Sequence, residues 1–131
     1  MPKMPIIFEG SHVAITPMQS KYRIGSTMEF TGYDTSIPPR RMELLKSAAR
    51  KYLHDPLCDP IEEEWFGWRP MTWDGKPIID RSPAMNNVWI AAGHNMLGLS
   101  MATGTGQLLK ELMLGETPHI SPVHFAAARF Q

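Results

Sequence analysis

The sequence has little of what marks a secreted, membrane-spanning or nucleic-acid-binding protein. Its 131 residues contain one cysteine, Cys58, so no internal disulfide can form, which is typical of a reducing compartment. No apolar run of about 18 residues is present, and the apolar N-terminal stretch is too short for a signal peptide. The formal net charge is zero. Because phosphate binding needs clustered lysine and arginine, we expect no nucleic acid partner.

The common short fingerprints of catalysis and nucleotide binding are also missing. The sequence contains no Gly-x-Ser-x-Gly, no P-loop and no Gly-x-Gly-x-x-Gly. No pattern typical of a metal site is present. The most compact group of potential metal ligands has a spacing that matches no zinc pattern. That group consists of His54, Asp55, Cys58 and Asp59. His119 and His124 lie on a proline-rich tail and form no better set, so we predict no metal site.

Twelve prolines and ten glycines indicate short strands and many turns. In the first half, alternating apolar residues predict strands over 11–17 and 21–31, joined by a short hairpin loop. Gly25 is expected to bend the second strand or mark a bulge. A helix is predicted over 37–53, with Ser36 as its N-cap. Its apolar positions are Met42, Leu45, Ala49 and Tyr52.

The second half is expected to mix extended segments with one more helix. Residues 62–68 are interpreted as extended, and Asp74-Gly75 as a turn before a strand at 77–79. The apolar run 88–92 predicts a buried strand. A helix over 99–114 should follow and end at Gly115. Its expected apolar stripe is Leu108, Leu109, Leu112 and Met113.

The segment between that strand and that helix is the first candidate site. Gly93 to Leu99 is a glycine-bounded loop that leads into a helix start, where unpaired backbone N–H groups and the positive end of the helix dipole attract anionic groups. Glycines that merely reverse the chain are the alternative. Gly104 and Gly106, inside the helix, indicate either close approach by a backbone or ligand, or tight packing of helix on sheet.

Arg69 and His94 are the two candidate functional side chains near this loop. Arg69 lies among tryptophans in the sequence, so its fork is suited to bind a carboxylate by two parallel hydrogen bonds. The alternative is an arginine stacked on tryptophan at the surface. His94 is either a proton carrier or a hydrogen-bonding spacer.

Together these motifs resemble the C-terminal part of the FAD-dependent D-amino acid oxidase/dehydrogenase superfamily. Bacterial D-amino acid dehydrogenases are the most similar members, and glycine and sarcosine oxidases are relatives. The resemblance covers most of the chain in the right order. It is carried by Gly67-Trp68-Arg69-Pro70-Met71-Thr72, Asp74-Gly75-Lys76-Pro77-Ile78-Ile79, residues 87–100 and 104–109, and the upstream stretch 23–34.

The resemblance implies a role for each matching residue. Arg69 matches the arginine that pairs with the substrate carboxylate. The loop of Gly93, His94, Asn95, Met96, Leu97, Gly98 and Leu99 matches the segment that lies against the flavin ring. His12 falls where some relatives have an active-site tyrosine. Met96 stands where glycine oxidases have a second arginine, which argues against that activity.

The resemblance also implies a fold class and a domain organisation. We expect an α+β chain in which residues 1–66 supply antiparallel strands and a helix of the substrate-binding domain. Residues 67–131 would supply the last strand and the C-terminal helix of the FAD-binding domain. The N-terminal Rossmann unit with its dinucleotide fingerprint is missing, so the chain is interpreted as a fragment. Its exposed edges predict self-association.

The predicted function is that of a portion of an FAD-dependent oxidoreductase that oxidises a small amine or a D-amino acid. Hydride passes from the α-carbon to flavin N5, and the imine is hydrolysed to an oxo acid. The isolated chain is expected to be inactive and to need a missing N-terminal FAD domain or a separate FAD-binding chain. A stand-alone, non-catalytic binding or assembly module is the alternative. We expect a cytoplasmic location, with peripheral inner-membrane association open for the parent enzyme, and either oxygen or a quinone as electron acceptor.

Overall fold

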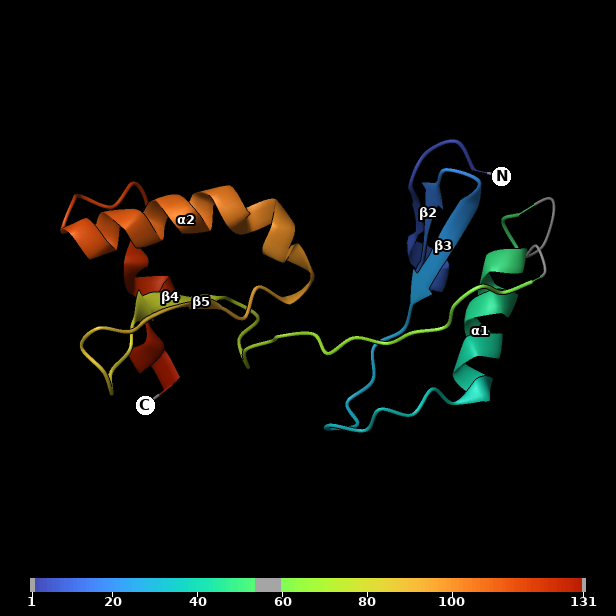
Figure 1. Ribbon diagram of the computed structural model, residues 1–131, viewed down its shortest axis with the longest axis horizontal. Coiled ribbons are helices and arrows are strands. Elements are labelled where there is room, and N and C mark those ends of the chain that lie inside the picture. The colour runs from blue at the N-terminus through green and yellow to red at the C-terminus, as the bar shows by residue number, and fades with distance from the viewer. Residues whose placement is uncertain (1, 54–59, 131) are drawn as a thin grey trace. The chain divides into compact units, whose positions relative to one another are not determined.

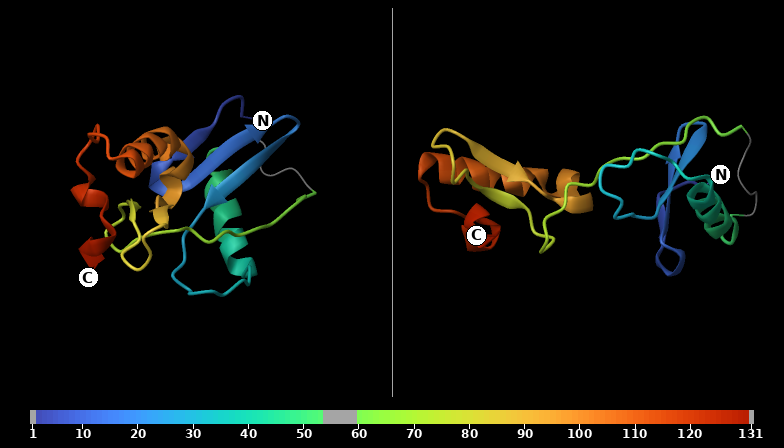
Figure 2. Two further views of the ribbon diagram at one scale, coloured as in Figure 1. Left: turned by 60° about the vertical axis from the view of Figure 1, so that its left-hand side comes forward. Right: turned by 90° about the horizontal axis from the view of Figure 1, so that it is seen from below.

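The computed structural model describes residues 2–53 and 60–130 and divides into two compact units, Met1–Phe66 and Gly67–Gln131. Each unit combines a small antiparallel sheet with one longer helix, so the α+β class is confirmed (Figures 1 and 2). Cys58 and the His54–Asp59 group lie outside the described residues. Within the described ranges, no helix is both long and apolar enough to cross a membrane. The assignment of the units to substrate and FAD domains stays a prediction.

The first unit is built on a three-stranded sheet of order β1-β2-β3, with β1 at Ile6–Phe8, β2 at Val13–Met18 and β3 at Lys21–Ser26. The predicted hairpin of β2 and β3 is present, although β3 ends at Ser26 rather than at residue 31. Gly25 pairs with Ala14 in an unbroken register, so the alternative of a bulge there is wrong, whereas a bend stays a prediction. The three-residue strand β1 was not predicted, because only its pairing with β2 defines it.

Helix α1 spans Pro39–Arg50, which is shorter than the predicted 37–53. Ser36 is not its N-cap, because Pro38 holds that position and the Ser36 N–H donates to Asp34 Oδ1 at 2.8 Å. A residue before proline avoids helical geometry, so the Pro38-Pro39 pair delays the helix start. Figure 1 shows α1 beside β2 and β3.

The core of the first unit lies between α1 and the sheet. Val13, Ile15 and Ala49 are fully buried there. The Tyr52 ring stacks on Phe8 with centroids 3.9 Å apart. Partly buried side chains complete this core, namely Phe8, Tyr22, Ile24, Leu45, Ala48 and Leu53.

The second unit contains a two-stranded antiparallel sheet of β4, Ile78–Arg81, and β5, Trp89–Ala92. The predicted turn is present, since Gly75 has φ 72° and its N–H donates to the Thr72 carbonyl at 3.1 Å. Residues 62–68 form no strand. The strand expected at 88–92 is present but not buried, because Val88, Trp89 and Ile90 are half-buried and Ala91 and Ala92 are exposed. An apolar run does not show how many strands will pair with it. In the described chain β5 pairs with β4 alone.

Helix α2 spans Gly98–Leu114 and runs along this sheet (Figure 1). It ends as predicted at Gly115, which is left-handed with φ 68°. Thr105, Leu108 and Glu111 form its buried face, one turn apart. Of the predicted stripe, Leu108 is buried, but Met113 is 54% exposed.

The helix glycines Gly104 and Gly106 have open space around them. A β-carbon at either position would meet no atom within 4 Å. Neither tight packing of helix on sheet nor close approach of a backbone is therefore found at these positions in the described chain.

Glu111 is a buried carboxylate that the apolar pattern did not predict, with only 6% of its surface exposed. Its Oε2 accepts the His119 N–H at 2.9 Å and lies 2.7 Å from His119 Nδ1. Gln107 Nε2 donates to Oε1 at 2.9 Å. The bonds from His119, with that from Gln107, lower the pKa of Glu111 from 4.5 to about 2 against the effect of burial. Glu111 thus fixes the chain that follows α2.

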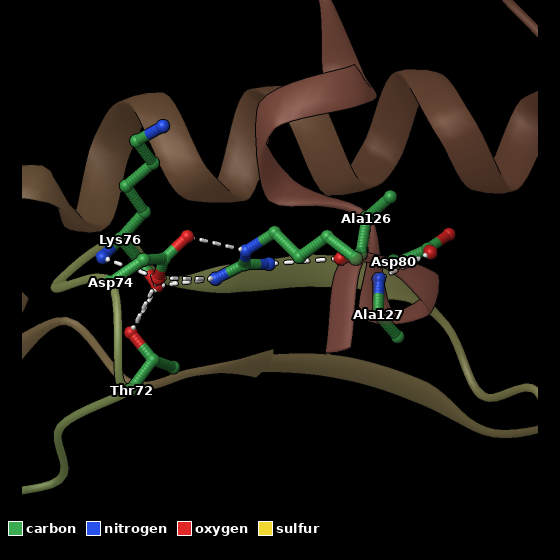
Figure 3. A network of polar contacts seen from close by, with 7 residues as sticks. Thr72, Asp74, Lys76, Asp80, Ala126 and Ala127 are labelled. Carbon is green, nitrogen blue, oxygen red and sulfur yellow. Dashed lines mark hydrogen bonds and ion pairs between the residues drawn. The ribbon is translucent and has the colours of Figure 1, made fainter. Parts of the chain in front are cut away.

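The C-terminal segment then returns to β4 through two short 3₁₀ helices, η3 at Pro122–Phe125 and η4 at Ala127–Phe130. The Ala127 N–H donates to Asp80 Oδ2 at 2.8 Å, and Arg129 pairs with Asp74 (Figure 3). Asp80 lies just beyond the strand predicted at 77–79. It is a residue of β4 and an anchor for the tail.

We expect Glu111 to make the stability of the protein depend on acid pH. Because folding lowers its pKa, the ionised carboxylate stabilises the fold fully above pH 4.5, and this contribution is lost as the pH falls toward about 2. Glu111→Gln should lower the melting temperature at pH 7 and flatten its acid dependence. Thermal unfolding followed by near-ultraviolet circular dichroism measures both effects.

Glu116→Gln is the matched control, because Glu116 forms an exposed ion pair with Lys110 at 2.6 Å. Exposed pairs contribute little, so this variant should melt close to the unchanged protein. Equal melting behaviour of the two variants would contradict the role given to Glu111.

Candidate functional site

The loop Gly93–Leu99 is shaped at its start by a backbone that only glycine accepts easily. Gly93 is buried and has φ +82°, and a β-carbon there would lie 2.8 Å from Thr72 Cγ2. Asn95 also has a positive φ, 57°. A short 3₁₀ turn, η2, covers Asn95–Leu97 before α2 begins. Glycine at position 93 therefore allows both the turn of the backbone and its close contact with Thr72.

The structure brings the Arg69 segment and this loop together. The Asn95 N–H donates to the Pro70 carbonyl oxygen at 2.9 Å. Met71 forms an isolated antiparallel bridge with His94. Arg69 immediately precedes these two contacts, so its backbone lies beside the loop. Two motifs that are distant in the sequence thus form one continuous surface.

The segment around Arg69 lies at the surface. Arg69 and Pro70 are exposed, and Trp73 is 98% exposed. The expected partial desolvation of Arg69 in an aromatic cluster stays a prediction. The Trp65 ring lies 5.3 Å from the guanidinium carbon of Arg23.

His94 ties the loop to the buried face of α2. Its Nε2 lies 2.9 Å from Thr105 Oγ1, at hydrogen-bond distance, and Thr105 is buried. This contact favours the spacer interpretation of His94. The loop is thus held from two sides, by Pro70 through the backbone and by Thr105 through a side chain.

The far end of the loop combines polar and apolar groups at the surface. No side-chain hydrogen bond caps α2 at Leu97, so its first-turn N–H groups and the positive dipole end carry no side-chain partner there. Met96, Leu97 and Leu99 are 69%, 49% and 93% exposed. Asn95 Oδ1 is buried without a hydrogen-bond partner in the described chain. The outer half of the loop is therefore an exposed surface rich in apolar side chains, next to the first turn of α2.

His12 lies in the first unit, where its backbone ends a 3₁₀ turn. It has φ 51°, and its N–H donates to the Glu9 carbonyl at 3.0 Å. Its own carbonyl accepts a hydrogen bond from Ser26 Oγ. The side chain is exposed, and a role for His12 at a site stays a prediction.

No metal centre is found in residues 2–53 and 60–130, where no three His, Cys, Asp or Glu side chains gather. Sequence reasoning did miss a polar network behind the loop, formed by Thr72, Asp74, Lys76 and Arg129 (Figure 3). The Asp-Gly turn was the one signal of it. Arg129 is 55 residues away from Asp74 in the sequence, and no spacing rule connects them.

The fold is thus that of an α+β chain in which the Arg69 segment and the loop Gly93–Leu99 lie side by side. The family model of FAD dependent oxidoreductases, DAO, matches residues 1–112, which include Arg69 and the whole of Gly93–Leu99. The chain belongs to this family. The superfamily expected from the motifs is confirmed, whereas D-amino acid dehydrogenase activity stays a prediction.

Gly93→Ala should destabilise the second unit. A non-glycine residue at positive φ costs about 1–3 kcal/mol, and the contact with Thr72 Cγ2 adds to this. Urea unfolding should therefore show a lower free energy of unfolding.

Gly106→Ala is the matched control, because position 106 lies inside α2 with open space around it. Alanine should stabilise that helix by about 1 kcal/mol. A neutral Gly93→Ala variant would show that the loop does not need its buried glycine.

Proposed function

We propose that the chain forms the substrate-facing and flavin-facing part of an FAD-dependent oxidoreductase that acts on a small amine or a D-amino acid. The observation that carries the proposal is the 2.9 Å hydrogen bond from the Asn95 N–H to the Pro70 carbonyl. It joins the Arg69 segment to the loop for which we propose contact with the flavin. The chemistry that FAD would supply when bound is that of a hydride acceptor for the substrate α-carbon. The imine product is then hydrolysed to an oxo acid.

Arg69 is proposed to bind the substrate carboxylate. Its guanidinium is always charged and presents two parallel donors that match the two oxygens of a carboxylate. Pro70 restricts the backbone of Arg69 to extended geometry, which limits the directions that the side chain can take. The exposure of Arg69 leaves it accessible to a small ligand. Orientation of the α-carbon by such a clamp is the main contribution this chemistry needs from the protein.

The loop Gly93–Leu99 is proposed to face the flavin ring. The first-turn N–H groups of α2 and its dipole would stabilise negative charge on a bound ring. The exposed side chains of Met96, Leu97 and Leu99 would cover an apolar face. Asn95 Oδ1, buried and without a partner in the described chain, can accept one further hydrogen bond. His12 is retained as a candidate second side chain at the substrate.

The rest of the FAD site is proposed to come from an N-terminal FAD domain or a separate FAD-binding chain. The 131 residues contain no Gly-x-Gly-x-x-Gly fingerprint to hold the pyrophosphate. We therefore expect this chain by itself to hold FAD weakly, to be inactive and to self-associate through its exposed apolar side chains. A cytoplasmic location and a quinone-type acceptor complete the proposal.

Arg69→Ala should weaken the productive binding of substrates that carry a carboxylate. In the chain supplied with its FAD-binding domain and FAD, kcat/KM for a D-amino acid should fall about 10- to 100-fold, which corresponds to the 1.5–3 kcal/mol of a charge-assisted hydrogen bond. The same variant should leave kcat/KM for the matching amine without a carboxylate nearly unchanged. Reduction of a dye under both substrates measures the difference.

Arg50→Ala is the matched control, since Arg50 forms an exposed ion pair with Glu43 on α1. It should leave both substrates unaffected. Equal kinetics of Arg69→Ala and the unchanged protein would remove Arg69 from the site. Absence of flavin binding and of turnover, even with an FAD-binding domain supplied, would favour a non-catalytic binding or assembly module.

A further inference from the structure

Arg129 makes more polar contacts than a solvent-facing arginine needs, and the proposed function uses none of them. Its Nε donates to Asp74 Oδ2 at 2.8 Å, and its Nη2 donates to Asp74 Oδ1 at 3.2 Å. Nη2 also donates to the Lys76 carbonyl at 2.6 Å, and Nη1 to the Ala126 carbonyl at 2.9 Å. Only 15% of the Arg129 side chain is exposed. Figure 3 shows the partners of these bonds, Asp74 and Lys76 in the turn and Ala126 in the tail.

The Asp74 carboxylate, which accepts two hydrogen bonds from Arg129, also organises the turn around it. Asp74 Oδ1 also accepts the Lys76 N–H at 3.1 Å and lies 3.1 Å from Thr72 Oγ1. The Arg129 guanidinium, with these two groups, holds the pKa of the Asp74 carboxyl well below its usual range. The Asp74 carboxylate therefore stays ionised, and able to pair with Arg129, at pH values below the usual pKa of an aspartic acid.

The same turn touches the candidate site on its other side. Thr72 Oγ1 donates to the Lys76 carbonyl at 2.6 Å, the oxygen that also receives Arg129. The Thr72 methyl group lies against Gly93, where a β-carbon would come within 2.8 Å of it. Met71 and Pro70, the next residues toward Arg69, pair with the loop at His94 and Asn95. The segment 70–76 thus connects Arg129 to the loop.

Two further bonds bring Arg129 to this place. The Ala127 N–H is fixed on Asp80 Oδ2 at 2.8 Å, and the His119 N–H on Glu111 Oε2 at 2.9 Å. Both partners belong to regular elements, β4 and α2. Residues 113–131 lie beyond the range 1–112 that the family model matches, so the family match assigns no role to this tail.

We propose that Arg129 is a positioning residue for the candidate site. By holding Asp74 and the Lys76 carbonyl, it fixes the segment 70–76 and so sets where Arg69 lies relative to the loop Gly93–Leu99. The inference rests on the proposed function for its kinetic consequence, but its structural consequence is independent of any cofactor. The C-terminal tail thus holds the segment 70–76 in place through the contacts of Arg129.

Amide hydrogen exchange in the full chain tests this coupling without FAD. In Arg129→Ala, the N–H groups of Asn95 and Gly75, which donate to Pro70 and Thr72, should exchange about tenfold faster. The amides inside α2 should exchange as before. Lys110→Ala, which removes an exposed ion pair of the same unit, is the matched control and should leave Asn95 unchanged.

A double-variant cycle separates the pair from a general loss of structure. If Arg129 acts through Asp74, then Asp74→Ala combined with Arg129→Ala should speed Asn95 exchange no more than the stronger single variant. Arg129→Lys keeps the charge and loses the fork, so it should restore only part of the protection. Should Arg129→Ala unfold the unit, Arg129→Lys provides the same comparison.

Unchanged exchange at Asn95 would overturn the proposal, as would equal acceleration throughout α2 or additive effects in the cycle. In the FAD-loaded protein, Arg129→Ala should raise KM for a D-amino acid several-fold more than it lowers kcat, and leave the amine unaffected. Failure of the proposed function is recognised separately, because Arg69→Ala would then be kinetically silent while the exchange result at Asn95 stands.

Discussion

The structure of the candidate site depends on one backbone hydrogen bond, from the Asn95 N–H to the Pro70 carbonyl oxygen, 2.9 Å long. It joins a segment with no secondary structure of its own to the loop that leads into α2. Isolated β-bridges are weak, and the neighbouring pairing of Met71 with His94 adds only one further contact. The site therefore needs support from outside, which the turn behind it supplies through Thr72.

Local sequence signals predicted the elements whose geometry is set by nearby residues. The hairpin of β2 and β3, the Asp74-Gly75 turn and the end of α2 at Gly115 all follow from the conformational preferences of a few adjacent residues. The family motifs likewise lie in continuous stretches. Errors arose where neighbours compete, as at α1, where two consecutive prolines outweighed Ser36 as a cap.

Contacts between distant parts of the chain were beyond such signals. Strand β1 is defined by its pairing with β2, and Glu111 is buried where His119 folds back onto it. The apolar pattern gave Glu111 no reason to face inward. The pairing of Arg129 with Asp74 spans 55 residues, and either residue alone is an ordinary surface charge. The motif order predicted that Arg69 and the loop belong to one site, but not what holds them together.

The lack of space for a side chain at Gly93 also distinguishes the loop positions that tolerate substitution from those that do not. Position 93 has no room for a side chain, and His94 and Asn95 are held through Thr105 and Pro70. In contrast, the side chains of Met96, Leu97 and Leu99 are exposed and add little to the buried core. Chemical diversity can therefore accumulate on the outer half of the loop while its inner half keeps the fold.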